Sequence, residues 1–220
     1  MKPSDYLHLQ MELEGIRSSG GNLIARASPY SDDLPLVLFA STVDDQKYLY
    51  FDDALSADIR DRLLTTDIPS FNIKNALDIV RMLGMSVNLG EFRTYIFPAD
   101  LHTDIRNVKC FRQHDPAVAA FGFSGLADTV YAIEQEGVIV SACVSSRQNG
   151  RSAEAWVATH PNHRRKGYAQ QVVSAWAGSM QRQGIIPFYS HSLQNTNSGN
   201  LARTLGLIHV FDEAVIEQAG

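Results

Sequence analysis

The sequence has few of the residues that build metal sites or disulfide frameworks. Only two cysteines occur, Cys110 and Cys143, and they form no CxxC pair. The seven histidines show no HExxH spacing. Because paired cysteines or closely spaced histidines are the usual signature of bound zinc, we expect no metal. The low cysteine content also favours a reducing, cytoplasmic location.

Long apolar runs are missing as well. No stretch approaches the roughly 18 to 20 apolar residues that a membrane-spanning helix needs. Residues 1–15 lack the uninterrupted apolar core of a signal peptide. We therefore expect no membrane partner. The sequence also shows no internal repeat and no low-complexity linker, which is typical of a globular chain.

The composition is that of an ordinary globular protein, but the charged residues are unevenly distributed along the chain. Of its 220 residues, 45% are hydrophobic and 20% are charged, and the formal net charge is -5. Residues 1–110 hold 11 basic and 16 acidic residues, a balance of -5, whereas residues 151–210 hold 6 basic residues and one acidic residue, a balance of +5. A local positive field in an acidic protein favours an anionic ligand. We expect no nucleic acid partner, because duplex binders usually spread basic residues over a wider face.

Residues 1–90 are expected to form a small α/β region whose role no motif indicates. The turn-forming pair Asp44-Asp45 lies between two apolar stretches and predicts a hairpin. Ser56 is a plausible N-cap for a helix, and Leu83 ends the apolar face of a second helix. The elements predicted here are strands at 34–41 and 47–51 and helices at 56–66 and 73–84.

Residues 91–220 are expected to form a second domain of strands joined by tight turns. Glu136-Gly137 and Gln148-Asn149-Gly150 predict two hairpins, and hence antiparallel neighbours. The stretch 116–121 favours a short helix. The predicted strands lie at 91–97, 130–133, 138–144, 154–159, 185–191, 207–211 and 214–217.

A strand–helix–strand crossover follows the hairpins. Pro161 ends the strand at 154–159, and apolar residues from Ala169 to Met180 then recur on one helical face. Gly184 ends this helix, and a last helix opens at Thr196 or Asn197. The fold class expected from these elements is α/β (α+β), with a mixed, mostly antiparallel central sheet and flanking helices.

A basic cluster at 163–166 stands where the strand gives way to the long helix. Gly167 follows the cluster at once. A helix N-terminus offers unpaired N–H groups and about half a positive charge, and glycine lets an anion approach the backbone closely. The stretch therefore predicts a phosphate or pyrophosphate cradle. It contains neither GxxxxGK(S/T) nor GxGxxG, so the P-loop and dinucleotide fingerprints do not apply.

The cluster and its surroundings resemble the GCN5-related N-acetyltransferase (GNAT) superfamily. Arg164-Arg165-Lys166-Gly167-Tyr168-Ala169 matches the signature R/Q-x-x-G-x-G/A of that family, with hairpins before it and an amphipathic helix after it. Residues 195–207 are similar to the family's segment N-x-x-S/A-x-x-L-Y-x-x-L-G-F. The resemblance covers roughly residues 91–220, which are therefore expected to form the acetyl-CoA-binding domain.

The resemblance implies that acetyl-CoA binds in a V-shaped gap between two splayed strands, here 154–159 and 186–191. Backbone groups of the first strand would pair with the pantetheine amides, and N–H groups of the cradle would hold the pyrophosphate. Asn195 would contact the pantetheine arm from the opposite wall. The cofactor-binding residues implied in this way are Trp156, Val157, Ala158, Thr159, Arg164, Arg165, Lys166, Gly167, Tyr168, Ala169, Asn195 and Ser198.

Several aromatic residues near this gap have two interpretations. Trp156 and Trp176 are expected in the core rather than against a ligand. Tyr189 and His191 share one strand face, where they could belong to the core or line the acceptor site. Cys143 is expected to act as a small buried hydrophobic residue.

The reaction that the resemblance implies is direct transfer of acetyl from CoA sulfur to a primary amine. An ammonium group must first lose a proton, and Glu154 is the first candidate for the base because it is the only acidic residue in 151–210. Alternatively, Glu154 points away and pairs with Arg151 or Arg147, and His191 is the base. The position that often carries a tyrosine in the family is Ala202 here, and Ser198 could supply a hydrogen bond to the leaving thiolate instead.

The missing tyrosine keeps other functions open. A non-catalytic acyl-CoA-binding or sensing module is the second hypothesis, and nucleic-acid binding through the basic loop is a third. The acceptor is expected to be a small-molecule or peptide amine, which the sequence does not identify further. We expect a monomer or a homodimer.

Overall fold

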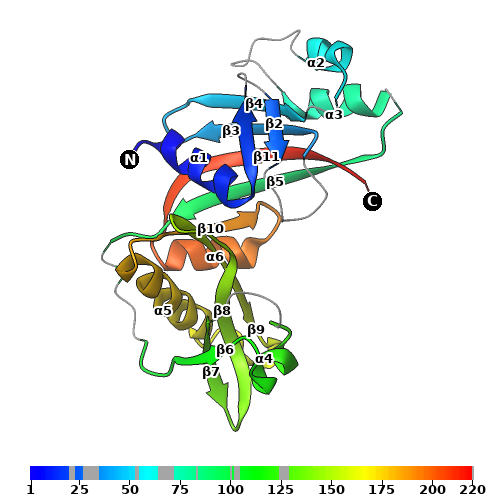
Figure 1. The fold of residues 1–220 in the computed structure, drawn as a ribbon. Helices are drawn as coiled ribbons and strands as arrows, with labels where there is room; N and C mark the ends of the chain where they lie inside the picture. The colour runs from blue at the N-terminus through cyan, green and yellow to red at the C-terminus, as the bar shows by residue number, and fades with distance from the viewer. Residues whose placement is uncertain are drawn as a thin grey trace. The chain divides into compact units, whose positions relative to one another are not determined.

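The structure is a computed structural model, and it describes residues 1–19, 23–26, 35–52, 55–63, 72–82, 84–99, 101, 105–123 and 129–219. Two compact units make up the chain (Figure 1). Unit 1 consists of Met1–Thr94, Ser192–Gln194 and His209–Gly220, and unit 2 consists of Tyr95–His191 and Asn195–Ile208. The chain thus leaves unit 1 near the end of β5 (Val87–Ile96), returns to it briefly at Ser192–Gln194, and returns again for its final strand. No helix in the described ranges is long and apolar enough to span a membrane.

Unit 1 is built on strands that pair mainly antiparallel, in the order β1-β2-β4-β3-β11-β5. The expected hairpin is present: β3 and β4 pair antiparallel, and Asp45 in their turn takes a left-handed φ of 61°. Position 34, residues 64–66 and Leu83, which belong to predicted elements, lie outside the described residues. The elements of unit 1 are α1 (Pro3–Leu13), β1 (Ile16–Ser19), β2 (Leu23–Arg26), β3 (Val37–Thr42), β4 (Lys47–Asp52), α2 (Ala57–Leu63), α3 (Ile73–Met82), β5 (Val87–Ile96) and β11 (Ile208–Gln218).

One long strand, β11, corrects the prediction of two short strands at 207–211 and 214–217. Its residues Phe211 to Ile216 pair without interruption with β3, from Thr42 to Val37. Asp212 and Glu213, which separate the two predicted strands, lie within this ladder and are partly exposed. Arg93 of β5 holds Asp212 through two hydrogen bonds of 2.7 and 2.8 Å, so the acidic pair does not end the strand.

Unit 2 contains the strands that carry the basic cluster, in the order β10-β9-β8-β7-β6. The chain forms the two predicted hairpins, β7–β8 and β8–β9, and both pair antiparallel. The sheets are therefore mixed and mostly antiparallel, and the predicted fold class is confirmed. The elements of unit 2 are β6 (Lys109–Arg112), α4 (Pro116–Phe121), β7 (Thr129–Gln135), β8 (Val138–Gln148), β9 (Ser152–Thr159), a 3-10 turn (Pro161–His163), α5 (Tyr168–Arg182), β10 (Ile186–Ser192) and α6 (Thr196–Thr204).

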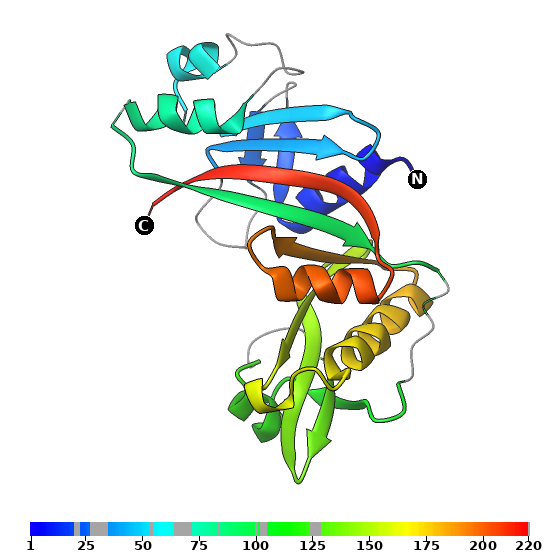
Figure 2. The ribbon, with the colours of Figure 1, turned by 180° about the vertical axis from the view of Figure 1, so that it is seen from behind.

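Helices cover both faces of the β7–β9 sheet, with α5 on one side and α4 on the other (Figure 2). The apolar stripe of α5 predicted from the sequence is buried: Val172, Val173 and Trp176 are fully inaccessible. The Trp176 indole N–H donates to Ser145 Oγ over 2.9 Å, which satisfies its polar atom in the core. This packing fixes the N-terminus of α5 next to the end of β9.

Strands β9 and β10 pair only at their beginnings. Their parallel register runs from Ser152 opposite Ile186 to Glu154 opposite Phe188. Within residues 129–219, no further pairing joins the two strands, although β9 continues to Thr159 and β10 to Ser192. The backbone edge of β9 beyond Glu154 therefore has no strand partner on this side, and the two strands leave a gap.

Candidate functional site

The loop between β9 and α5 has a backbone shape that few sequences can adopt. After the 3-10 turn, Arg164 is extended, Arg165 has a φ of 62°, and Gly167 has a φ of 76° at the start of α5. A left-handed conformation is uncommon for arginine, and such strain persists mainly where the surroundings impose it, often at functional sites. A left-handed turn next to a helix N-terminus is a backbone arrangement that can direct several N–H groups at an anion.

A cavity of about 710 Å³ opens in front of this loop. Its charged side chains are those of Arg164 and Arg165, and among the residues that the structure describes no aspartate or glutamate lines it. The helix terminus and the two arginines give the cavity a positive potential suited to phosphate groups. Its lining residues are Val157, Ala158, Thr159, His163, Arg164, Arg165, Gly167, Tyr168, Ala169, Gln170, Tyr189, Asn195, Asn197, Ser198 and Leu201.

Two positions in the cradle support an anionic ligand. Gly167 has a φ of 76°, which disfavours a side chain, and a Cβ there would lie only 3.3 Å from Gln170 Oε1, so this position favours a bare backbone that an anion can approach. His163 Nδ1 is buried, and none of the residues that the structure describes offers it a hydrogen bond. A ligand oxygen at the cradle would satisfy such a polar atom.

The far wall of the cavity is formed by β10 and α6. Asn195 caps α6, since its side-chain oxygen accepts from the Ser198 N–H over 3.1 Å. The Tyr189 hydroxyl donates to the Ser198 carbonyl over 3.5 Å. Burial raises the pKa of Tyr189 to about 12. The phenol therefore stays protonated at ordinary pH and presents a hydrogen-bond donor at this wall.

The structure brings the implied cofactor residues together around this one cavity, with the exception of Trp156 and Lys166. The expectation that Trp156 lies in the core is wrong, because its side chain is 44% exposed, whereas Trp176 is fully buried as expected. Strand alternation explains the difference: Val157 faces α5, so Trp156 must face the other way. Cys143 is fully buried, and burial raises the pKa of its thiol.

The two candidate bases lie outside the lining of the cavity. Glu154 is mostly buried, and its Oε2 forms an ion pair with Arg147 Nη1 at 3.0 Å, the alternative arrangement that the sequence left open. His191 stacks on Tyr95, with 5.7 Å between ring centroids, and its Cε1 lies 3.3 Å from the position of a Cβ on Gly199. Ser198 lines the cavity directly. Tyr189 belongs to the core cluster of unit 2 and also lines the cavity, whereas His191 is not among the lining residues.

Sequence reasoning missed some of the lining residues. The sequence indicated His163 only as part of the basic cluster and not as a residue of the cavity wall. Its ring stacks on Tyr168 with 6.5 Å between ring centroids. Gln170 lies within the first turn of α5 and lines the cavity. Asn197 and Leu201 follow from α6, where the helical period from Ser198 would have indicated Leu201.

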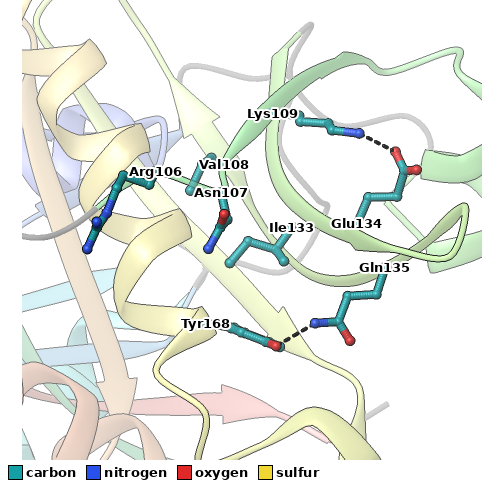
Figure 3. A pocket seen from close by; sticks show the side chains of 8 residues that line it. All are labelled: Arg106, Asn107, Val108, Lys109, Ile133, Glu134, Gln135 and Tyr168. Atoms are coloured by element: carbon teal, nitrogen blue, oxygen red, sulfur yellow. Dashed lines mark hydrogen bonds and ion pairs between the residues drawn. The ribbon is translucent and has the colours of Figure 1, made fainter.

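A second, smaller cavity of about 390 Å³ shares Tyr168 with the first (Figure 3). The Tyr168 side chain points toward Gln135, whose amide donates to the phenol oxygen over 2.5 Å. Lys109 and Glu134 form an ion pair at 3.3 Å on the other side of this cavity. Tyr168 is thus a wall between the two cavities, held in place by β7.

The comparisons with known proteins agree with this geometry. Residues 118–213 match the family model described as GNAT acetyltransferase. A search of the curated proteins finds no match. A solved protein from Novosphingobium aromaticivorans DSM 12444, assigned to the GNAT family of acetyltransferases, aligns with a TM-score of 0.51 and 16% identity over 62% of this chain and 68% of that one.

Two further structures align over more of the chain. The GCN5-related N-acetyltransferase-like protein from Streptococcus suis 89/1591 gives a TM-score of 0.50 and 15% identity, covering 86% of this chain and 87% of that one. A GNAT-family acetyltransferase from Colwellia psychrerythraea gives 0.50 and 11%, covering 100% and 98%. These likenesses concern the fold. Together with the family model, which matches residues 118–213, they confirm the resemblance of this part of the chain to the GNAT superfamily.

Proposed function

We propose that this protein transfers an acetyl group from acetyl-CoA to a primary amine by direct attack of the amine on the thioester. The observation that carries the proposal is the single cavity of about 710 Å³, which joins the cradle at 164–169 to the gap between β9 and β10. A cationic cradle at one end and an unpaired strand edge along the side suit a ligand with a pyrophosphate and an amide-containing arm.

Each part of the cavity has a proposed role. N–H groups of the loop and of the first turn of α5 would hold the pyrophosphate, with Arg164 and Arg165 at its rim. Beyond Glu154, the free edge of β9 would pair with the amides of the pantetheine arm, and Asn195 and Ser198 would contact the arm from α6. The amine nitrogen then forms a bond to the carbonyl carbon, the carbon–sulfur bond breaks, and the ammonium proton passes to a base or to solvent.

The catalytic roles of Glu154, His191 and Ser198 are part of the proposal. Glu154 or His191 would accept the proton through a water, since neither side chain lines the cavity. Ser198 is the donor at the far wall that would stabilise the departing thiolate, since the Tyr189 hydroxyl donates its one proton to the Ser198 carbonyl. Ala202 is fully buried in the core and supplies no such group.

Binding of CoA tests the first half of the proposal. Isothermal titration with CoA and acetyl-CoA is expected to give micromolar-range affinity for the wild-type protein. Gly167→Glu should abolish binding, because the side chain is strained at a φ of 76° and brings negative charge to the cradle. Gly150→Glu is the matched control, since a Cβ at Gly150 meets nothing within 4 Å. Equal CoA affinity in a folded Gly167→Glu protein would remove the proposed cofactor site.

Turnover tests the second half. Release of free CoA thiol from acetyl-CoA in the presence of a panel of primary amines is expected from the wild-type protein. Tight binding without amine-dependent thiol release would instead favour a non-catalytic acyl-CoA-binding module. The ion pair of Glu154 with Arg147 and the alanine at position 202 are the observations that keep this second function open.

A further inference from the structure

Trp156 is an exposed aromatic side chain on a rigid support. The structure describes no other exposed tryptophan or phenylalanine. Its ring stacks on that of Phe123 with 4.6 Å between centroids and 26° between planes. Phe123 is buried, and Phe121 packs edge-on against it at 5.1 Å. The indole is thus fixed from behind while 44% of the side chain stays accessible.

Trp156 lies on a face of β9 that continues into the main cavity. Alternation places Glu154, Trp156 and Ala158 on the same face of the strand, opposite Val157. Ala158 packs against the cluster of α4 that contains Phe123, and it also lines the cavity. Trp156 is therefore two residues along β9 from Ala158, which forms part of the cavity wall.

An acceptor must reach the thioester from a side that the protein does not fill. On the α5 face, Val157 and Tyr189 line the cavity that is proposed to hold the acyl donor, so the donor occupies this side. On the α4 face, Ala158 has a small side chain, and the side chain of Trp156 is 44% exposed. The approach is therefore expected over the indole of Trp156.

The surroundings of Trp156 indicate the chemistry of the acceptor. The charged groups next to it on the strand are Glu154 and Arg147, which neutralise each other at 3.0 Å. What the face offers is a flat apolar ring, which gains most from stacking against another flat apolar group. A short alkylamine can make only a cation–π contact with the indole and has no ring to stack on it.

We propose that Trp156 is the docking platform for the acceptor, and that the acceptor class is a primary amine carrying an aromatic ring on a short alkyl arm. The ring stacks on the indole, and the arm carries the nitrogen past Ala158 to the thioester. This inference rests on the proposed function, because it requires that the cavity hold the acyl donor.

Fluorescence tests the docking directly. The chain has two tryptophans, and Trp176 is fully buried, so acrylamide quenching reports on Trp156. With CoA bound, 2-phenylethylamine is expected to protect the wild-type emission from acrylamide in a saturable way, whereas n-butylamine protects it much less. Trp156→Phe leaves Trp176 as the sole emitter and should show no protection.

Kinetics test the specificity. The ratio of kcat/KM for 2-phenylethylamine to that for n-butylamine should fall about 3- to 12-fold in Trp156→Ala, the usual size of an aromatic pair contribution. Most of the loss should appear in KM for the aromatic amine, because stacking binds the ground state and the transition state alike. Trp156→Phe should restore most of the ratio. Val138→Ala is the matched control, since Val138 is exposed on β8 outside the site.

The inference and the proposed function can fail separately. Absence of CoA binding in the titration would overturn the proposed function. If CoA binds but 2-phenylethylamine gives no saturable protection, the platform is refuted. An unchanged kcat/KM ratio in a folded Trp156→Ala protein would likewise refute it, whatever the absolute rates.

Discussion

At the scale of single residues, Glu154 and His191 are the two side chains proposed to accept a proton from the acceptor. They lie on adjacent strands in different surroundings. Glu154 is ion-paired with Arg147 and mostly buried, whereas His191 stacks on Tyr95. The two can be separated by substitution, because Gln matches Glu in shape and removes the carboxylate without opening a cavity.

We expect Glu154→Gln to preserve CoA binding and to slow transfer if Glu154 is the base. The loss should be about 100- to 10,000-fold, the usual contribution of a general base. It should appear in kcat and kcat/KM together, since the proton leaves only on the way to the transition state. The loss should shrink as pH rises, because more of the amine is then deprotonated in solution. Initial rates from pH 6 to pH 10 measure this.

Near-normal turnover by Glu154→Gln across that range would make Glu154 a structural partner of Arg147. His191→Gln in the same assay would then distinguish a histidine base from solvent. Neither profile should contain a tyrosine ionisation below about pH 10, because position 202 is alanine and burial raises the pKa of Tyr189 to about 12.

At the residue scale, the sequence indicated where α5 begins, next to Gly167, better than which side chains are exposed. The position of Gly167 at the start of α5 could be predicted, because a glycine between a basic cluster and an apolar helical pattern is typical of an anion-binding helix start. The exposure of Trp156 could not be recognised, because strand alternation fixes two faces without saying which one a helix covers. The ion pair of Glu154 was one of two arrangements, and only the register of Arg147 opposite Glu154 decides between them.

At the scale of elements, β5 and β11 share an ionic cluster within unit 1. Arg93 binds Asp212 in a bidentate manner, and His209 Nε2 lies 2.9 Å from Asp212 Oδ1. Partial burial tends to raise the pKa of Asp212, but hydrogen bonds and charges from Arg93 and His209 outweigh it, so the pKa lies well below its usual range. The carboxylate is therefore favoured more in the folded than in the unfolded chain.

This difference predicts how stability depends on pH. A carboxyl group with a lowered folded pKa stabilises the protein above its unfolded pKa, about 3.9, and loses that contribution as pH falls toward the folded pKa. Asp212→Asn should therefore lower the free energy of unfolding at pH 7, with a deficit that shrinks below about pH 4. The effect should be modest and salt-sensitive, because the side chains are more than a third exposed.

Urea unfolding at pH 7 and pH 3, at low and high salt, measures this deficit. Asp58→Asn is the matched control, since it breaks the more exposed Asp58–Arg62 pair and should change little. A deficit that is as large at pH 3 as at pH 7 would mean that Asp212 acts through packing or hydrogen bonding alone.

Elements were predictable wherever periodicity and turn residues agreed. The α5 helix satisfied both, with its apolar stripe and Gly184 after its end. Strand β11 did not, since Asp212 and Glu213 resemble a turn in the sequence. Arg93 lies 119 positions earlier in the chain, and its bidentate contact compensates the negative charge of Asp212 within the strand. A partner so distant in the sequence cannot be recognised from the residues around Asp212.

At the scale of the whole molecule, the two units have separate cores, and a core substitution should act within its own unit. Ile216 of β11 is fully buried in the core of unit 1, and Ile139 of β8 is buried in unit 2. Ile216→Ala should cost about 2 to 5 kcal/mol in unit 1. Hydrogen exchange should then rise in peptides from β3, β4 and β5, but not in peptides from β8 and β9.

Ile139→Ala is the reciprocal variant, and it should raise exchange in β7–β9 while sparing β3 and β4. The proposed CoA site lies in unit 2, so Ile216→Ala, which acts on unit 1, should leave the affinity for CoA unchanged. Equal loss of protection throughout the molecule in both variants would mean that the two units unfold as one cooperative body.

The division itself was only partly accessible from sequence. The change in charge balance and the start of the family pattern placed a boundary at residue 90/91, close to where unit 2 begins. No sequence signal assigned residues 209–220 to unit 1, because this assignment depends on pairing between β11 and β3 across more than 150 residues of chain. The extent of each unit as an independently folding domain stays a prediction.

The return of the chain to unit 1 through β11 has a consequence for how the protein is made. A ribosome delivers residues 95–208 before it delivers β11, so unit 2 can be complete while the β3 edge of unit 1 still lacks its partner. Synthesis thus finishes the inserted unit first and the N-terminal unit last, the reverse of the usual order. Until Ile216 has left the ribosome, the nascent chain carries an open strand edge that can pair with another chain.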